Sequence, residues 1–244
     1  MSELGSRGRI GLIVPSVNTV AEPEMNQMKP EGVTVHAARL LIPGDISSLG
    51  AFIQMCEVGC RNAAKAVKEL ATAKVDVYAF TFTAGSFFRG AGWDEEIAKQ
   101  IADSGQAPCV VTSAAAIEAL QAYQVKKIAV VSPYAIANEL LKNFVQQKGI
   151  EVLGMEGLTL SSAQEEGRQT RATLQNLVQR ANVLEAEAIL VACTNFATLA
   201  ALDELENSLG KLIISANQAT FWAALRLLGI KDKIEGFGRL LREK

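Results

Sequence analysis

Histidine is nearly absent from this 244-residue chain, which holds only His36. A single histidine excludes the closely spaced cysteine and histidine ligands of a zinc site, and no metal site is expected. It also excludes a Ser–His–Asp triad unless His36 takes part. Excess charge of one sign is lacking too. The formal net charge is −2, so there is no basic surplus to bind the phosphates of nucleic acid.

Long apolar runs and cysteines are also few. No stretch approaches the ~20 apolar residues of a membrane span, so no membrane partner is expected. The N-terminus is short and polar with no secretory signal, and the reducing cytoplasm is the expected location of a chain with four cysteines. Cys56 and Cys60 lie on an expected helix and Cys109 in an expected strand. Free cysteine in such places usually packs as a small apolar residue.

The fourth cysteine, Cys193, has different surroundings. An apolar run over 188–192, rich in branched residues, follows Glu187 and ends in Cys193, Thr194 and Asn195. This pattern predicts a buried parallel strand with Cys193 at its carboxyl end, where open α/β sheets bind ligands. A helix is expected over 197–209, and the dipole and N–H groups at its start would lower the pKa of the thiol. We therefore interpret Cys193 as the catalytic residue.

Strand-like and helix-like segments alternate along the chain, which predicts an α/β fold with parallel sheets. The two halves of the sequence also resemble each other. The matching segments are 9–15 with 127–133, 75–83 with 187–194, and 108–120 with 211–225. We infer two pseudo-symmetric lobes, each with a parallel sheet flanked by helices, and an active site in the cleft between them. The expected N-terminal lobe is 9–115 plus 216–240, and the expected C-terminal lobe is 116–215.

Loops at four expected strand ends should converge on that cleft. These loops, 15–19, 82–86, 132–138 and 193–196, are rich in neutral hydrogen-bonding groups and poor in charge. Such groups can hold a carboxylate, although each of them could instead cap a helix. The candidates are Asn18, Thr83, Ser86, Tyr134, Asn138, Thr194 and Asn195. Arg89 is the one cation nearby, either in a salt bridge or in contact with a carboxylate.

Three segments carry a resemblance to a known superfamily. Residues 14–24, Val-Pro-Ser-Val-Asn-Thr-Val-Ala-Glu-Pro-Glu, resemble the N-terminal signature of maleate cis-trans isomerases. Residues 86–91 resemble a stretch of arylmalonate decarboxylase, and residues 220–227 resemble a late helix of this branch in general. Both enzymes belong to the aspartate/glutamate racemase superfamily, so the resemblance implies two α/β lobes with the site between them.

The resemblance also implies a pair of cysteines, one from each lobe, facing each other across the substrate. Cys193 matches the second cysteine, whereas Phe82 followed by Thr83 stands where the first is expected. A two-base racemase needs an acid/base group on both faces of its substrate, so racemase activity is not expected. Arylmalonate decarboxylase resembles this chain in using one cysteine, at the Cys193 position, and provides the leading interpretation.

By this resemblance the protein is a cofactor-free lyase that decarboxylates a substituted malonate-type dicarboxylic acid. Thr83, Tyr134 and the backbone N–H groups of 193–195 would hold one carboxylate. An apolar pocket would destabilise the other and favour loss of CO2. Cys193 would then protonate the enediolate. The pocket candidates are Pro15, Leu41, Ile42 and Phe82. Ala84 and the pair Thr194-Asn195 depart from the decarboxylase pattern and predict a tighter, more polar pocket.

Two other interpretations stay open. In a maleate-type cis-trans isomerase, the Cys193 thiolate would add to the double bond, allow rotation and leave, with Asn18 and Tyr134 holding the carboxylates. In a binding or sensor protein without turnover, Cys193 would need no special reactivity. The expected partner is in each case a small dicarboxylate. The oligomeric state is open, with a homodimer as a common arrangement in the superfamily.

Overall fold

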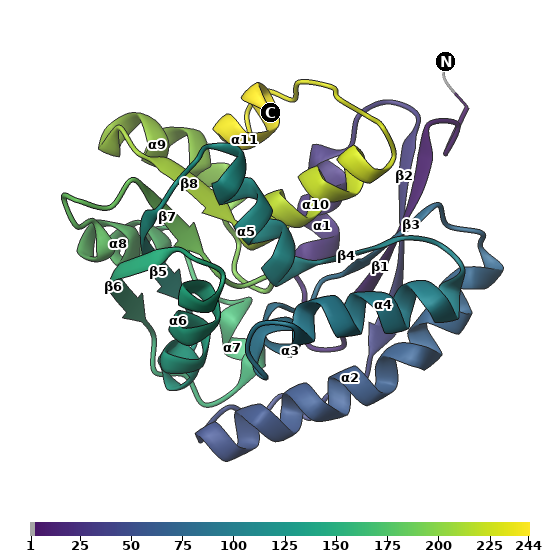
Figure 1. Ribbon diagram of the computed structural model, residues 1–244, viewed down its shortest axis with the longest axis horizontal. Coiled ribbons are helices and arrows are strands. Elements are labelled where there is room, and N and C mark those ends of the chain that lie inside the picture. Colours follow the sequence, from purple (N-terminus) through teal and green to yellow (C-terminus); the bar gives the residue numbers. More distant parts are fainter. Residues whose placement is uncertain (1–2) are drawn as a thin grey trace.

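The computed structural model describes residues 3–244 and contains two four-stranded parallel sheets (Figure 1). The first sheet has the order β2-β1-β3-β4 and the second has the order β6-β5-β7-β8. The strands of the first sheet are β1 (Gly8–Pro15), β2 (Val33–Leu40), β3 (Val77–Phe80) and β4 (Cys109–Val111). Those of the second are β5 (Lys127–Ser132), β6 (Glu151–Gly157), β7 (Ala188–Val191) and β8 (Leu212–Ser215). The predicted duplication of a parallel α/β unit is confirmed by this shared topology.

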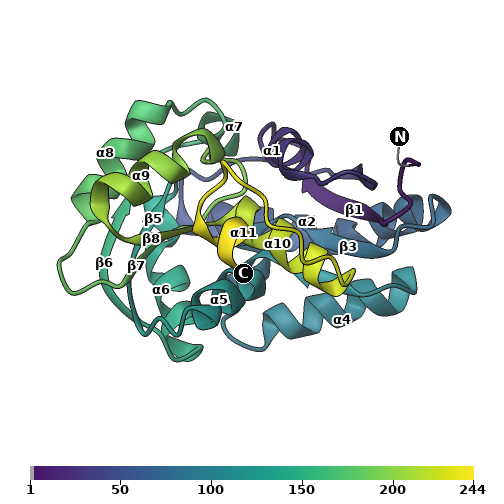
Figure 2. The same cartoon turned by 90° about the horizontal axis from the view of Figure 1, so that it is seen from above.

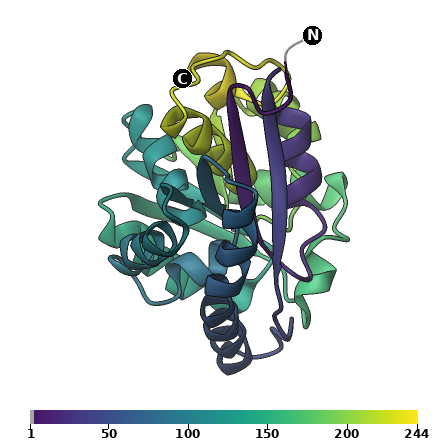
Figure 3. The ribbon, with the colours of Figure 1, turned by 90° about the vertical axis from the view of Figure 1, so that its right-hand side faces the viewer.

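Helices cover both faces of the sheets. Those of the first half are α1 (Ala21–Met28), α2 (Leu49–Thr72), α3 (Thr83–Phe87), α4 (Trp93–Gly105) and α5 (Thr112–Ala122). Those of the second half are η1 (Ala135–Ala137), α6 (Asn138–Gln147), α7 (Ala163–Glu166), α8 (Arg171–Ala181), η2 (Leu199–Ala201), α9 (Leu202–Leu209), α10 (Ala216–Leu227) and α11 (Arg239–Glu243). Figure 3 shows α1 on one side of β1 and β2 and the long α2 on the other. None of these described helices is long and apolar enough to cross a bilayer.

The helix α10 joins the two halves. It follows β8 of the second sheet, yet it packs against α1, β3 and β4 of the first half and against α5. Phe221 and Leu225 of α10 are fully buried, and the Thr220 hydroxyl donates a hydrogen bond of 3.0 Å to the Thr112 hydroxyl of α5. Seen from above, α5 and α10 lie between the two sheets (Figure 2). The division into lobes 9–115 plus 216–240 and 116–215 stays a prediction.

Two expected element boundaries differ from those in the structure. The apolar residues 150–153 predict a strand and residues 154–166 predict mostly loop, whereas in the structure the strand β6 continues to Gly157 and the later segment ends in the short helix α7. The helix expected to begin at 197 begins later, as the short turn η2 at Leu199 followed by α9 at Leu202. Both differences affect the surroundings of Cys193.

Candidate active site

The carboxyl ends of the central strands of both sheets enclose a small cavity. Most of the residues predicted from the sequence to form the site meet there. The lining residues are Pro15, Val17, Asn18, Ile42, Met55, Phe82, Thr83, Ala84, Tyr134, Ala163, Glu166, Cys193, Thr194 and Asn195. Because both halves of the chain contribute to this lining, the cavity lies where the duplication predicts a site.

Three sequence candidates, Leu41, Ser86 and Asn138, lie elsewhere. Ser86 is fully buried, and its hydroxyl donates a 2.7 Å hydrogen bond to the Thr83 carbonyl. Leu41 follows β2 and is 74% exposed, whereas Leu40 and Ile42 on either side of it are buried. Alternation of side chains along an extended segment turns Leu41 outward, so the predicted pocket role of Leu41 does not fit the structure. Asn138 begins α6, and its side-chain oxygen accepts a 2.8 Å hydrogen bond from the Ser132 hydroxyl rather than facing the cavity.

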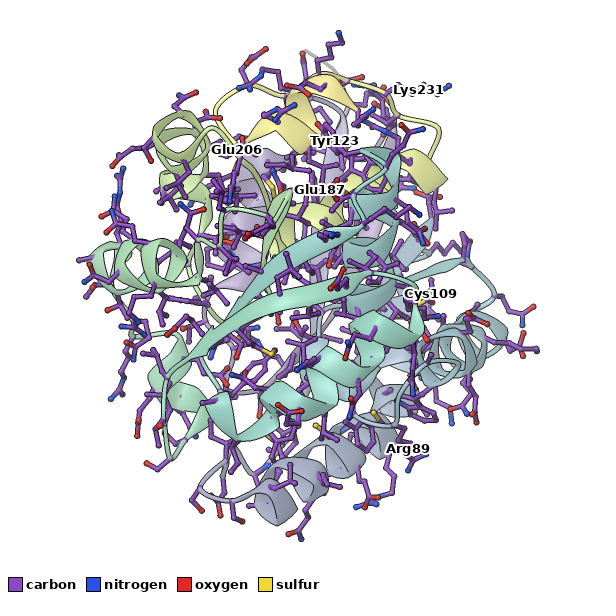
Figure 4. The ribbon with its side chains drawn as sticks, turned by 60° about the vertical axis from the view of Figure 1, so that its left-hand side comes forward. Arg89, Cys109, Tyr123, Glu187, Glu206 and Lys231 are labelled. Carbon is purple, nitrogen blue, oxygen red and sulfur yellow. The ribbon has the colours of Figure 1, made fainter. Side chains whose placement is uncertain are left out.

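Arg89 also lies away from the cavity. Its guanidinium group stacks over the Trp93 ring at 4.3 Å from the centroid and lies 3.8 Å from Glu57. Figure 4 shows Arg89 at the edge of the molecule, pointing outward. These contacts favour the salt-bridge interpretation of Arg89. The single histidine, His36, also lies elsewhere: it bonds to the Thr34 hydroxyl on β2 and does not line the cavity.

Cys193 lies two residues after β7 and is 4% exposed. Its sulfur accepts a hydrogen bond from the Asn195 N–H at 3.3 Å and donates one to Glu166 Oε2 at 3.4 Å. Burial raises the pKa of the Cys193 thiol well above its ordinary value, and the nearby Glu166 adds to the rise. The prediction that a helix start lowers this pKa is wrong, because no helix begins until Leu199 and the sulfur is desolvated.

Glu166 is the ionisable lining residue that the sequence did not reveal. It is the last residue of α7 and is 6% exposed. Burial raises the pKa of its carboxyl to about 8, although hydrogen bonds from Cys193 and Asn195 oppose the rise. At neutral pH the carboxyl is therefore mostly protonated. In the sequence it follows Glu165 in a polar segment, and no local pattern separates a buried carboxylate from a solvated one.

Phe82 occupies the place in the first lobe that Cys193 occupies in the second. Phe80 pairs with Ile13 across β1 and β3, as Val191 pairs with Val131 across β5 and β7, and each residue of interest follows two positions later. The Phe82 ring packs against Gly59 and Gly85, where an added Cβ would come within 2.5 and 2.4 Å of it. Two glycines thus make room for an aromatic ring on this wall of the cavity.

Most polar groups of the lining already have partners within the protein. The Asn18 side-chain oxygen accepts the N–H groups of Val20 and Ala21, and its amide donates to the Thr194 hydroxyl at 3.1 Å. The Tyr134 hydroxyl donates to the carbonyl of Ala192. The Thr83 hydroxyl is different. Within residues 3–244, it is the one buried side-chain polar atom in the lining without a hydrogen-bond partner. Such a hydroxyl is available to a ligand.

Thr83→Val should therefore weaken ligand binding without cost to the fold. We expect the KM for a carboxylate substrate to rise by roughly tenfold, since one hydrogen bond to a charged group contributes about 1.5 kcal/mol. The free energy of unfolding should not fall, because an unpaired buried hydroxyl is removed. Thr112→Val is the matched control. The Thr112 hydroxyl donates to the Phe80 carbonyl outside the cavity. Thr112→Val should therefore lower the free energy of unfolding and leave KM unchanged. Steady-state kinetics and urea unfolding check both; an unchanged KM in Thr83→Val would contradict a ligand contact.

The family model of arylmalonate decarboxylase matches residues 10–241. The chain belongs to this family. A maleate isomerase from Pseudomonas putida is 30% identical over 96% of each chain. Arylmalonate decarboxylase from Bordetella bronchiseptica is 32% identical over 66% of this chain and 69% of its own. The structure of a maleate isomerase from Pseudomonas putida S16 with maleate superimposes with a TM-score of 0.90 at 25% identity, covering 96% of this chain and 97% of the other.

These similarities confirm the predicted superfamily branch and its two-lobed fold. The protein is an enzyme of the arylmalonate decarboxylase family, which contains decarboxylases and maleate isomerases. Among the described residues that line its cavity, none is Lys, Arg or His. An anion bound in this member of the family would therefore be held by neutral donors, and its presence would favour the protonated form of Glu166.

Glu24 of α1 connects the two halves of the chain through hydrogen bonds. Its buried carboxylate accepts the N–H groups of Thr198 and Leu199 at 2.6 and 2.9 Å and the side-chain amide of Asn217 at 2.7 Å. The same Asn217 amide donates to the carbonyl of Thr194. Glu24 thus fixes the loop that follows Cys193 from the opposite lobe. Sequence reasoning placed Glu24 in the N-terminal signature without assigning it a role.

Proposed function

We propose that this enzyme isomerises the double bond of a maleate-type cis-enedioic acid, with Cys193 as the nucleophile. The observation that carries the proposal is the position of the Cys193 sulfur. The sulfur is buried in a cavity that both lobes line, and it accepts a hydrogen bond from the Asn195 N–H. This hydrogen bond would stabilise the Cys193 thiolate when it forms. The similarity to maleate isomerases over nearly the whole chain supports this reaction over decarboxylation.

In the proposed reaction, Sγ of Cys193 adds to one carbon of the double bond. The two electrons of the π bond move to the other carbon and its carboxylate, forming an enediolate. The former double bond is then a single bond and can rotate. The C–S bond breaks and its two electrons return to sulfur, the double bond re-forms in the trans geometry, and the proton that left Sγ when it added is returned to it. In this proposal the Thr83 hydroxyl, which has no partner within the protein, would donate to a carboxylate of the substrate.

Decarboxylation of a substituted malonate is the second candidate, and Phe82 is the observation that favours it. With Phe82 opposite Cys193, the first lobe places an aromatic ring beside Ile42 and Met55 and offers no second thiol. An apolar wall of this kind would destabilise one buried carboxylate and favour loss of CO2. The Cys193 thiol, which is protonated at neutral pH, would then donate its proton to the enediolate.

An assay in D2O separates the two candidates. Purified enzyme is given maleate or phenylmalonate without added cofactor, and the products are followed by proton NMR. We expect fumarate from maleate with its vinyl protons retained, because addition and elimination at sulfur exchange no carbon-bound hydrogen. Phenylacetate carrying one deuterium would instead establish the decarboxylase. If neither substrate is turned over while maleate still binds, the proposal fails in favour of a binding or sensor protein.

A further inference from the structure

Cys193 and Glu166 form an isolated buried pair. The sulfur and Glu166 Oε2 are 3.4 Å apart, and both residues line the cavity. Both come from the second lobe, Glu166 from α7 and Cys193 from the loop after β7. The wall contributed by the first lobe includes Asn18, Phe82 and Thr83, none of which exchanges protons near neutral pH. A group that handles the proton of Cys193 must therefore be found beside it, on the same wall.

The other titratable groups that act on this pair come from three elements. They are Tyr134, which precedes η1, Cys56 of α2 and Glu24 of α1. Burial raises the pKa values of Tyr134 and Cys56 well above their ordinary values, so both stay neutral through the physiological range. Glu24 is held by its own hydrogen bonds to Thr198, Leu199 and Asn217 and does not contact the sulfur. Glu166 alone among them makes a hydrogen bond to Sγ.

From this geometry we propose that Glu166 is a catalytic acid–base residue that takes the proton of Cys193 and returns it. The assignment of the step rests on the isomerase function proposed above. As Sγ bonds to the alkene carbon, its proton passes to the Glu166 carboxylate, and the π electrons pass into the enediolate. After rotation the C–S bond breaks, its electrons return to sulfur, and Glu166 gives the proton back to Sγ. Protons and electrons balance within the pair and the substrate.

The two groups should titrate as one unit. When one proton has left, the remaining proton is shared between oxygen and sulfur, and this singly protonated pair is the reactive form. Below about pH 8, where the Glu166 carboxyl ionises, the pair holds both protons and turnover should fall tenfold for each pH unit. Decarboxylation would show the opposite dependence, because Cys193 then acts as an acid and turnover falls as protons are lost.

Glu166→Gln tests the assignment by kinetics, because glutamine keeps the shape and removes the titrating oxygen. We expect kcat on maleate to fall on the order of a hundredfold or more, the usual contribution of a general base, while KM changes by less than about threefold. Glu165→Gln is the matched control. Glu165 is on the same short helix, bonds to Ser161 and Ser162, and does not line the cavity, so kcat should be unchanged. Retention of the wild-type kcat in Glu166→Gln would overturn the proposal.

Alkylation of Cys193 by iodoacetamide, followed by peptide mass spectrometry, tests the pair without any substrate. In the wild type, the rate should rise with pH to about pH 8 and then level off, because the pair has then lost one proton and the share of it that carries the thiolate is constant until the second proton leaves. In Glu166→Gln the rate should rise without a break through that region. The same profile in both proteins would overturn the pairing. Because this readout needs no turnover, it stands even if the isomerase assignment fails.

Discussion

Cys193→Ser is expected to lower kcat on the order of a thousandfold or more for either candidate reaction. A serine hydroxyl holds its proton far more tightly than a thiol, so it neither adds to an alkene nor donates a proton to an enediolate at a useful rate. The fold and ligand binding should be preserved, because the smaller oxygen can still accept the Asn195 N–H and donate to Glu166. Steady-state turnover and calorimetric titration with maleate measure the two effects separately.

Cys109→Ser is the matched control for this substitution. Cys109 lies on β4, its sulfur donates only to the neighbouring Val110 carbonyl, and it does not line the cavity. We expect its kcat to equal that of the wild type. Substantial turnover in Cys193→Ser, with Cys109→Ser unchanged, would show that the sulfur of Cys193 takes no part in bond making or proton transfer. Both candidate mechanisms would then be wrong.

Glu24→Ala is expected to lower the free energy of unfolding by about 3 kcal/mol or more. The substitution leaves the buried N–H groups of Thr198 and Leu199 and the amide of Asn217 without their acceptor. It also releases the loop after Cys193 from α1, so kcat should fall together with stability. Urea unfolding followed by circular dichroism, with turnover measured on the same preparations, gives both numbers.

Glu22→Ala provides the comparison for Glu24→Ala, because Glu22 lies on the same helix but faces solvent. Its carboxylate pairs with Arg39 at 2.9 Å with both side chains at least 40% exposed, and exposed pairs of this kind contribute less than about 1 kcal/mol. If Glu24→Ala unfolds at the same urea concentration as Glu22→Ala, the buried carboxylate does not hold the lobes together.

The strands and the duplication were predictable because the central strands β1, β3, β5 and β7 are short apolar runs and each half repeats the same order of elements. The same pattern located Cys193, since a thiol directly after such a run must lie at the carboxyl edge of a sheet. Glu166 was not predictable. Its burial depends on the position of α7 beside the cavity. Because α7 lies in a polar segment, the sequence does not distinguish this buried glutamate from an exposed one. The state of the Cys193 thiol was mispredicted for a related reason, because it depended on where the following helix begins.

The crossing of α10 onto the first sheet has a consequence for how the protein is made. The strands of that sheet leave the ribosome early, but the helix that packs on β3 and β4 is synthesised only after the entire second sheet. Until then the nascent N-terminal half exposes apolar surface that Phe221 and Leu225 later cover. We expect this N-terminal half to depend on chaperones during translation. If translation stops early, the truncated chain should be degraded rather than accumulate as a folded fragment.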